Sequence, residues 1–241
     1  MRGGWLTMQH FWVVGTDTDV GKTIVTTLLM CQLQRLGLNI TPFKPVQTGE
    51  VYDNLHSYYA DTAMYEKYSL QALNKEHMNG YSFKEAASPH FAAQLEGQQI
   101  DVGNLLQRMQ FLQESYDVVI AEGAGGLFVP LDVQQSKTLL DVIVSSKLPV
   151  VLVTRTSLGT INHTLLTMEA LQSRQIDVLG IVFNGDTGSM MEQDNINTIL
   201  QYHPLPYAVI PRLQDISQLV NINITHTTLF ERLYGNGTRN N

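Results

Sequence analysis

Cysteine is almost absent from this chain of 241 residues, which contains Cys31 alone. A single thiol cannot form an internal disulfide, so a reducing compartment is the simplest setting for the protein. No apolar run approaches the roughly 18 residues that a membrane-spanning helix needs, and none precedes Asp17 as the core of a signal peptide. The sequence therefore predicts a soluble, cytoplasmic protein with no membrane partner.

Basic residues are also in the minority, since 15 Lys and Arg stand against 22 Asp and Glu. The resulting net charge of −7 argues against a nucleic-acid partner, because such surfaces need basic patches. The seven histidines show no metal-ligand spacing, and no linker or internal repeat interrupts the chain. We expect residues 1–7 to be an N-terminal extension that need not be ordered, and residues 8–241 to form one domain.

The chain does contain a regular alternation of apolar runs and helical patterns. Six short apolar runs are predicted strands, at 10–14, 40–43, 117–121, 149–154, 178–183 and 207–210. Helical spacing occurs near 24–36, 88–96, 101–115, 137–147, 160–174, 190–202 and 227–234. This alternation predicts a single-domain α/β fold with a mostly parallel, twisted sheet and helices on both faces. Only residues 50–87, which are polar and irregular, are expected to form a loop with one short helix.

A phosphate-binding loop is predicted over residues 15–23, between the first strand and the first helix. Gly21-Lys22-Thr23 opens the helix, so backbone N–H groups and the helix dipole can bind phosphate there. We expect Lys22 to reach the β- and γ-phosphates of a nucleotide, and the Thr23 hydroxyl to ligate Mg²⁺. The loop is an acidic variant, with Thr16 where the standard pattern has glycine. The motif predicts an ATP-dependent enzyme with a P-loop fold.

Charged residues also follow other predicted strands, and the carboxyl ends of parallel strands form the ligand-binding edge of such sheets. Lys44 is either a solvated loop lysine or a group that neutralises charge on a transferring phosphoryl group. Glu122 precedes a glycine-rich turn, so it either ends a strand there or approaches Mg²⁺ and phosphate. Asp61 either caps a helix over 62–68, which its position alone favours, or ligates Mg²⁺.

Two further groups follow later strands. The start of the predicted helix at 160–174 has N–H groups that suit a carboxylate, whereas Asn162 could equally be a structural hydrogen-bonding residue. Asn184 follows the fifth predicted strand, and residues 211–213 follow the sixth. Because an Asn side chain can pair with an adenine edge, these residues are candidates for a purine site.

Together these motifs resemble the dethiobiotin synthetase family, and they match it in order and spacing from about residue 10 to 215. The matching segments are Gly15-Thr16-Asp17-Thr18-Asp19-Val20-Gly21-Lys22-Thr23, Lys44-Pro45-Val46-x-x-Gly49, Ser88-Pro89-His90, Glu122-Gly123-Ala124-Gly125-Gly126, Leu158-Gly159-x-Ile161-Asn162-His163, Asn184 and Ile210-Pro211. The resemblance implies a homodimeric, ATP-dependent cyclo-ligase of biotin biosynthesis that uses 7,8-diaminopelargonate, CO₂ and Mg-ATP. One amine takes up CO₂ as a carbamate, ATP phosphorylates the carbamate, and the second amine closes the ureido ring.

The resemblance also implies roles for individual residues. The implied catalytic residues, which hold the carbamate and the γ-phosphate, are Lys22 and Lys44. The implied Mg²⁺ ligands are Thr23, Asp61 and Glu122. The implied ATP-binding residues are Asp19, Val20, Gly21, Lys22, Thr23, Asp61, Glu122, Gly123, Ala124, Gly125, Asn184, Pro211, Arg212 and Leu213. The diamine is expected at Thr48, and its carboxylate tail at a helix start across the homodimer interface, formed by Gly159, Thr160, Ile161 and Asn162.

Two positions depart from the family, and two other functions compete with it. Asp19 stands where the family more commonly has glutamate, so the carboxylate at this position reaches less far. Arg155 stands where relatives tend to have a small residue. A partition-type ATPase switch needs a leading loop lysine, but Asp17 occupies that place. A cobyrinate-type amide synthetase usually adds a glutamine-hydrolysing domain with a nucleophilic cysteine, whereas Cys31 lies in a predicted helix.

Overall fold

The computed structural model describes residues 9–53 and 56–235, and the predicted extension at 1–7 lies outside this part of the chain. Seven strands form one sheet in which every neighbouring pair is parallel. In spatial order they are β11 (Tyr207–Pro211), β10 (Val178–Asp186), β9 (Val150–Arg155), β1 (Phe11–Gly15), β6 (Val118–Glu122), β2 (Ile40–Thr48) and β5 (Asn79–Phe83). The predicted parallel α/β fold is confirmed, and so are the six predicted strands.

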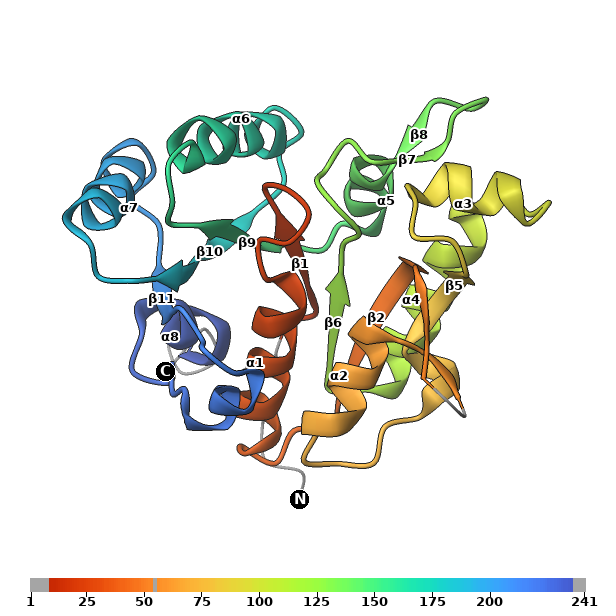
Figure 1. Cartoon of the computed structure of the whole chain (residues 1–241), viewed down its shortest axis with the longest axis horizontal. Helices are drawn as coiled ribbons and strands as arrows, with labels where there is room; N and C mark the ends of the chain where they lie inside the picture. Colours follow the sequence, from red (N-terminus) through yellow and green to blue (C-terminus); the bar gives the residue numbers. More distant parts are fainter. Residues whose placement is uncertain (1–8, 54–55, 236–241) are drawn as a thin grey trace, which may run out of the picture.

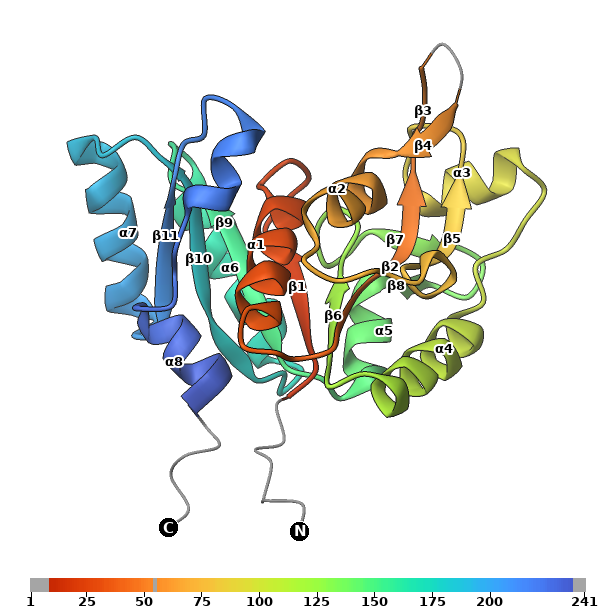
Figure 2. The same ribbon diagram turned by 90° about the horizontal axis from the view of Figure 1, so that it is seen from below.

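Helices cover both faces of this sheet. They are α1 (Lys22–Gln34), α2 (Ala60–Tyr68), α3 (Pro89–Leu95), α4 (Val102–Ser115), α5 (Leu139–Ser146), α6 (Thr160–Gln172), α7 (Met190–Tyr202) and α8 (Thr228–Gly235), with short 3₁₀ turns η1 (Lys75–His77) and η2 (Ile216–Asn221). In Figure 1, α1, α2 and α8 lie on one side of the sheet and α5, α6 and α7 on the other. The view from below in Figure 2 places α1, α2 and α8 in front of the strands.

The alternation of side chains along each strand divides the hydrophobic core in two. In β1, Phe11 and Val13 belong to the cluster that α1 and α8 cover. Trp12 and Val14 point the other way, into the cluster that α4, α5 and α6 cover. All four side chains are at most 1% exposed. Burial on both faces explains why the central strands appear in the sequence as continuous apolar runs.

The prediction for residues 50–87 was wrong, because this region contains more regular structure than one helix. It holds the hairpin β3 (Glu50–Tyr52) and β4 (Ser57–Tyr59), then α2, η1 and β5. Strand β5 lies at the edge of the sheet and pairs with β2. Only Phe83 of its five residues is buried, so no apolar run marks this strand in the sequence. A second small hairpin, β7 (Pro130–Asp132) and β8 (Lys137–Thr138), leads into α5.

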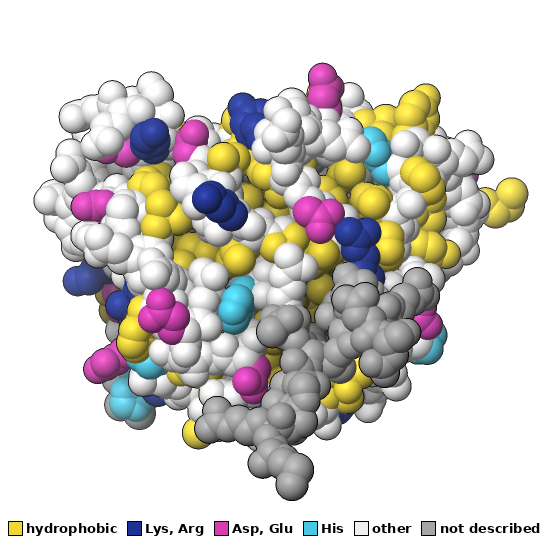
Figure 3. Space-filling model, turned by 180° about the vertical axis from the view of Figure 1, so that it is seen from behind, with side chains coloured by type: hydrophobic (Ala, Val, Ile, Leu, Met, Phe, Trp, Pro, Cys, Tyr) yellow, Lys and Arg dark blue, Asp and Glu magenta, His cyan; other side chains and the backbone are white. Residues whose placement is uncertain are grey.

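The surface of the described part of the chain shows two simple features. None of the helices within residues 9–53 and 56–235 is both long enough and apolar enough to cross a membrane. On the face shown in Figure 3, Lys and Arg side chains are scattered rather than gathered in one patch.

Candidate functional site

The loop between β1 and α1 lies at the carboxyl end of the sheet, as the sequence predicts. Gly21 precedes α1 with a φ of +96°, a left-handed conformation that favours glycine. A Cβ atom on Gly21 would lie 2.0 Å from Nδ2 of Asn184, so a side chain there would displace the Asn184 amide. Helix α1 begins at Lys22, and the N–H groups of its first turn have no partner within the helix. They can therefore bind phosphate oxygens.

Lys22 is buried beneath this loop. Its ammonium donates a hydrogen bond to the backbone carbonyl of Asp17, 2.7 Å away. Burial, together with the neighbouring charge of Lys44, lowers the pKa of Lys22 to about 8, although nearby carboxylates oppose the shift. An anionic phosphate at the loop would stabilise the charged form of this lysine, because opposite charges favour ionisation.

Lys44 lies between two carboxylates rather than in solvent. Its Nζ atom is 2.6 Å from Oδ2 of Asp61 and 2.6 Å from Oε1 of Glu122. Lys44 and Glu122 are buried, and Asp61 is one-third exposed. Burial opposes the charge on Lys44, but the two carboxylates outweigh it and raise its pKa. Burial likewise opposes the charge on Asp61, whereas the Lys44 ammonium lowers the pKa of that carboxyl. The alternative of a solvated loop lysine was wrong.

The Thr23 hydroxyl completes this cluster. Its Oγ1 atom lies 2.8 Å from Oδ1 of Asp61 and 2.7 Å from Oε1 of Glu122. The fold thus brings together the three predicted Mg²⁺ ligands, which come from α1, α2 and β6. Asp61 lies in the first turn of α2, whose N-cap is Tyr59, and no side chain caps this helix end. The helix-capping alternative for Asp61 was therefore wrong.

The oxygen atoms of this cluster fit Mg²⁺ by their chemistry. Mg²⁺ is a hard cation that is usually held by one or two carboxylates together with water and substrate phosphates. A hydroxyl and two carboxylates beside a phosphate-binding loop supply that set. Within the described ranges, no group of three His, Cys, Asp or Glu side chains forms an all-protein metal cage. The arrangement favours a metal that arrives with phosphate oxygens.

Tyr65 is part of the cluster, although sequence reasoning missed it. It is fully buried in α2, and its hydroxyl donates a 2.5 Å hydrogen bond to Oε2 of Glu122. Burial, with Glu122 and Asp61 nearby, raises the pKa of Tyr65 well above its usual value. The spacing from Asp61, four residues along one helix, was the signal in the sequence that could have identified it.

One cleft of about 440 Å³ joins the loop to this cluster. Its lining includes most of the predicted catalytic, metal and phosphate-binding residues, together with Thr48 at the end of β2. These residues are Asp19, Gly21, Lys22, Thr23, Lys44, Thr48, Asp61, Glu122, Ala124 and Gly125. The Gly123 carbonyl accepts a 3.4 Å hydrogen bond from Lys44 Nζ. The fold therefore places the predicted phosphate and diamine residues around a single cleft.

The predicted adenine residues lie on the other side of β1. Nδ2 of Asn184 donates to the carbonyl of Val20, 3.0 Å away, so Asn184 is tied to the phosphate loop. Pro211 ends β11 beside Asp186, and the Arg212 N–H donates to the Asp186 carbonyl at 2.8 Å. Asn184 and Pro211 thus lie near the carboxyl ends of the neighbouring strands β10 and β11, and Arg212 and the half-buried Leu213 follow β11 at the same edge of the sheet as the loop.

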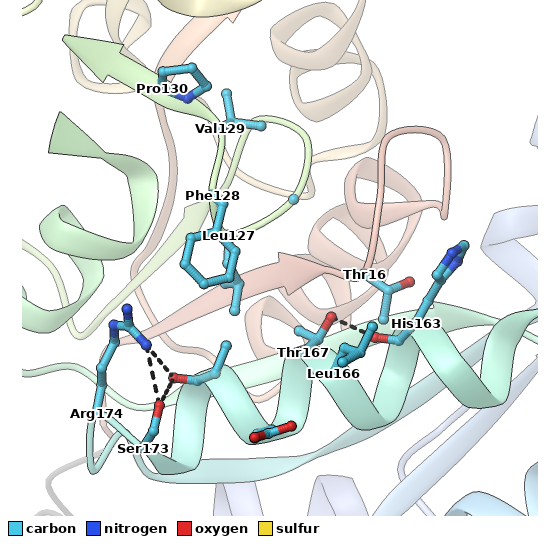
Figure 4. Close-up of a pocket in the computed structure, with 13 residues that line it drawn as sticks. Thr16, Leu127, Phe128, Val129, Pro130, His163, Leu166, Thr167, Ser173 and Arg174 are labelled. Atoms are coloured by element: carbon cyan, nitrogen blue, oxygen red, sulfur yellow. Dashed lines mark hydrogen bonds between the residues drawn. The ribbon is translucent and has the colours of Figure 1, made fainter. Parts of the chain in front are cut away.

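The predicted tail-binding residues do not line this cleft. Gly159, with a φ of +91°, precedes α6, while the buried Thr160 turns its hydroxyl inward to the Arg155 carbonyl, 2.6 Å away. Ile161 is half-buried and Asn162 is exposed. A separate groove of about 710 Å³ runs between α6 and residues 126–130. Figure 4 shows Thr16 and His163 near one end of this groove, and Phe128 and Arg174 near the other. Residues 159–162 therefore lie outside the cleft that Thr48 lines, and the groove beside α6 is lined from the next residue, His163, onward.

Comparison with solved structures gives the fold. A ParA family ATPase from Chlorobium tepidum TLS has a TM-score of 0.57 and 12% identity, over 96% of this chain and all of that one. The septum site-determining protein MinD from Pyrococcus horikoshii OT3 has a TM-score of 0.55 and 16% identity, over 93% and 92% of the two chains. At such low identity these likenesses show a shared P-loop fold alone.

Sequence comparison identifies the family. The family model of the AAA domain matches residues 9–221. The ATP-dependent dethiobiotin synthetase BioD of Lysinibacillus sphaericus (strain C3-41) is 94% identical over 234 residues, which are 97% of this chain and 100% of that protein. The protein of the same name from Lawsonia intracellularis (strain PHE/MN1-00) is 39% identical over 94% of this chain and 99% of the Lawsonia chain. This chain belongs to the family of ATP-dependent dethiobiotin synthetases.

Proposed function

We propose that this protein closes the ureido ring of dethiobiotin from 7,8-diaminopelargonate, CO₂ and ATP, as a ligase of biotin biosynthesis. The family of its relatives supports the reaction. The observation that carries the chemistry is Lys44, whose ammonium lies 2.6 Å from both Asp61 and Glu122 within the cleft that holds the phosphate loop. A buried cation at that point can stabilise charge on a phosphoryl group in transfer.

ATP is proposed to bind with its triphosphate on the loop and the start of α1. Lys22 and the N–H groups at the helix start hold the β- and γ-phosphates. Asn184 and residues 211–213 flank the adenine, beyond β9 from the phosphate loop in the order of the sheet. Thr23, Asp61 and Glu122 would hold Mg²⁺, which would neutralise negative charge on the phosphates of ATP.

The diamine is proposed to lie in the same cleft, beside Thr48 and Lys44. One amine takes up CO₂ to give a carbamate, whose anionic oxygen Lys44 can hold toward the γ-phosphate. Transfer of that phosphoryl group gives a carbamic-phosphoric anhydride and ADP. The second amine then attacks the anhydride carbonyl, which forms the ring C–N bond and expels phosphate. Such chemistry depends on positioning and charge neutralisation and needs no protein nucleophile.

We further propose a homodimer, in which the partner's α6 start binds the carboxylate tail of the diamine. The tail residues lie outside the cleft that Thr48 lines in the same chain, which is expected if two chains share each substrate. The face that carries α6 is apolar, with Leu158 at 84%, Phe128 at 59% and Leu166 at 56% exposure. Exposed apolar groups of this kind are typical of protein contacts. The cytoplasmic location expected from the sequence stays a prediction.

The reaction is tested by phosphate release from ATP with and without 7,8-diaminopelargonate and bicarbonate. The proposal expects release that depends on both, with dethiobiotin identified by mass spectrometry. Equal rates with and without the diamine would contradict it. The dimer is tested separately by sedimentation, where Leu166→Glu should shift the protein toward monomers.

A further inference from the structure

Arg155 is a distinctive residue of this chain, and the proposed reaction gives it no role. It is the last residue of β9, which lies beside β1 in the sheet. Gly15 at the end of β1 pairs with Val153, so Asp17 and Arg155, each two residues further on, lie next to each other. The guanidinium Nη2 of Arg155 is 3.0 Å from Oδ2 of Asp17.

The backbone around both residues is held in place. The Thr16 N–H donates to the Val153 carbonyl at 3.1 Å, which fixes the start of the loop against β9. The Arg155 carbonyl accepts a 2.6 Å hydrogen bond from the Thr160 hydroxyl. That hydroxyl is also 2.8 Å from Oγ1 of the buried Thr154. The ion pair therefore joins two positioned segments rather than two loose loops.

Asp17 makes three contacts at the loop. Its Oδ1 accepts the Thr18 N–H at 2.7 Å, its Oδ2 faces Arg155, and its carbonyl accepts from Lys22. The carboxylate thus belongs to the loop that would receive a nucleotide's phosphates and lies next to Thr18, which lines the cleft. A negative charge there opposes phosphate binding unless a cation compensates for it.

The surrounding charges supply little compensation. Four carboxylates surround the loop and cleft, on Asp17, Asp19, Asp61 and Glu122. Two lysines balance them only in part, and the ammonium of Lys44 is already placed between two of those carboxylates. Arg155 is the further cation that the structure places against Asp17.

We propose that Arg155 is a positioning residue that neutralises Asp17 and so allows this acidic loop to accept the triphosphate of ATP. The inference rests on the proposed ATP site. The side chains of Arg155 and Asp17 are 41% and 52% exposed, so solvent screens the pair and its effect is moderate. Neutralisation has a specific consequence: removing the charge of Asp17 must make Arg155 dispensable.

The test measures the dissociation constant of ATP, in the presence of Mg²⁺, for the full chain and its variants. Arg155→Ala should weaken ATP binding by about two- to fivefold, in the range expected for a partly exposed charge pair. Asp17→Asn should bind as tightly as the unaltered protein or more tightly. The double variant should match Asp17→Asn, so the two changes are not additive. Arg155→Lys keeps the charge and should retain most of the affinity.

Other roles for Arg155 predict different results. If the guanidinium touched ATP directly, the double variant would stay as weak as Arg155→Ala, which would overturn the proposal. If Arg155 bound the diamine instead, Arg155→Ala would raise KM for the diamine and leave ATP binding unchanged, which would also overturn it. Raised ionic strength should shrink the difference between Arg155→Ala and the unaltered protein, and an undiminished difference would count against a charge effect.

Arg232→Ala is the matched control. Arg232 pairs with Asp177 at 3.1 Å with similar exposure, near the amino end of β10 and so at the opposite edge of the sheet. Its loss should leave ATP affinity unchanged, and an equal loss of affinity would show that Arg155→Ala acts through general destabilisation. If the unaltered protein fails to bind ATP, the proposed function fails. If it binds ATP and Arg155→Ala binds equally well, the role of Arg155 alone is refuted.

Discussion

Asn184 lies so close to Gly21 that a methyl group on the glycine would come within 2.0 Å of the asparagine Nδ2. The same Nδ2 atom donates to the carbonyl of Val20 at 3.0 Å. The end of β10 thereby supports the turn from which α1 starts, although 164 positions separate the two bonded residues. The phosphate loop consequently depends on a strand that is remote in sequence.

Gly21→Ala should therefore disrupt the loop. The new methyl group meets Asn184, and the φ of +96° is strained for any residue with a Cβ atom. We expect ATP binding to weaken at least about tenfold, as shown by calorimetric titration. Gly37→Ala is the control, since Gly37 has a φ of +83°, but a Cβ atom there would meet no atom of the described residues within 4 Å. Equal loss in both variants would mean that backbone strain, and not contact with Asn184, is responsible.

Tyr65→Phe should lower both stability and turnover. The change removes the hydroxyl that donates to the buried carboxylate of Glu122, and a hydrogen bond to a charged group contributes about 2 kcal/mol. Urea unfolding and kcat measure the two effects. Tyr68→Phe is the matched control, because within the described residues the buried Tyr68 hydroxyl has no hydrogen-bond partner. A stability loss in Tyr68→Phe as large as in Tyr65→Phe would contradict the role given to Tyr65.

Lys44→Ala and Lys22→Ala should both abolish turnover but differ in stability. Removing Lys44 leaves the carboxylates of Glu122 and Asp61 unpaired, and breaking a buried ion pair costs about 3 kcal/mol. Lys22 donates to a neutral carbonyl, so its loss should lower the midpoint of thermal unfolding much less. Added Mg²⁺ should restore part of the stability of Lys44→Ala, because a divalent cation can compensate the same carboxylates. Equal midpoints for the two variants would contradict this difference.

ATP affinity should fall as the pH rises above about 8. Lys22 has its pKa lowered from 10.5 to about 8, chiefly by burial, so the unliganded protein loses this positive charge at mildly alkaline pH. Binding measured between about pH 7 and pH 9.5 should be tight at the lower end and progressively weaker above about 8. A Lys22→Arg variant, if it binds ATP, should lose this dependence because arginine stays charged.

The same pKa shift has the opposite effect on folding. A lysine whose pKa is lowered in the folded state releases its proton before the unfolded chain does, so stability from this group rises between about pH 8 and pH 10.5. Denaturant unfolding of the unaltered protein and of Lys22→Met over this window isolates the contribution. A stability that fell more steeply in the unaltered protein than in Lys22→Met would contradict the lowered pKa.

Sequence reasoning succeeded where local pattern and position in the fold coincide. The phosphate loop follows β1, Glu122 ends β6 and Lys44 lies within β2, and these buried parallel strands are the clearest elements in the sequence. The role of Asp61 could not be predicted in this way, because a carboxylate in the first turn of a helix is expected whether it stabilises the helix or binds a cation. Only its contacts with Lys44 and Thr23 distinguish the two roles.

Other features depend on contacts between distant segments. Strand β5 has no apolar run because it lies at the sheet edge, and Tyr65 lies in a region with weak patterning. The pairing of Arg155 with Asp17 follows from the register of β9 against β1, which no local pattern specifies. Sequence reasoning noticed Arg155 only as a departure from its relatives, and the structure supplies its partner.

The order of the sheet also affects how this protein can fold during synthesis. Strand β6 lies between β1 and β2, although it follows both in the sequence. A nascent chain that ends before Val118 contains the phosphate loop, Lys44 and Asp61. It lacks β6, the strand that pairs with both β1 and β2. Long-range parallel pairing of this kind is slow to form. The cluster of Lys44, Asp61 and Glu122 should therefore assemble only after about half of the polypeptide has left the ribosome.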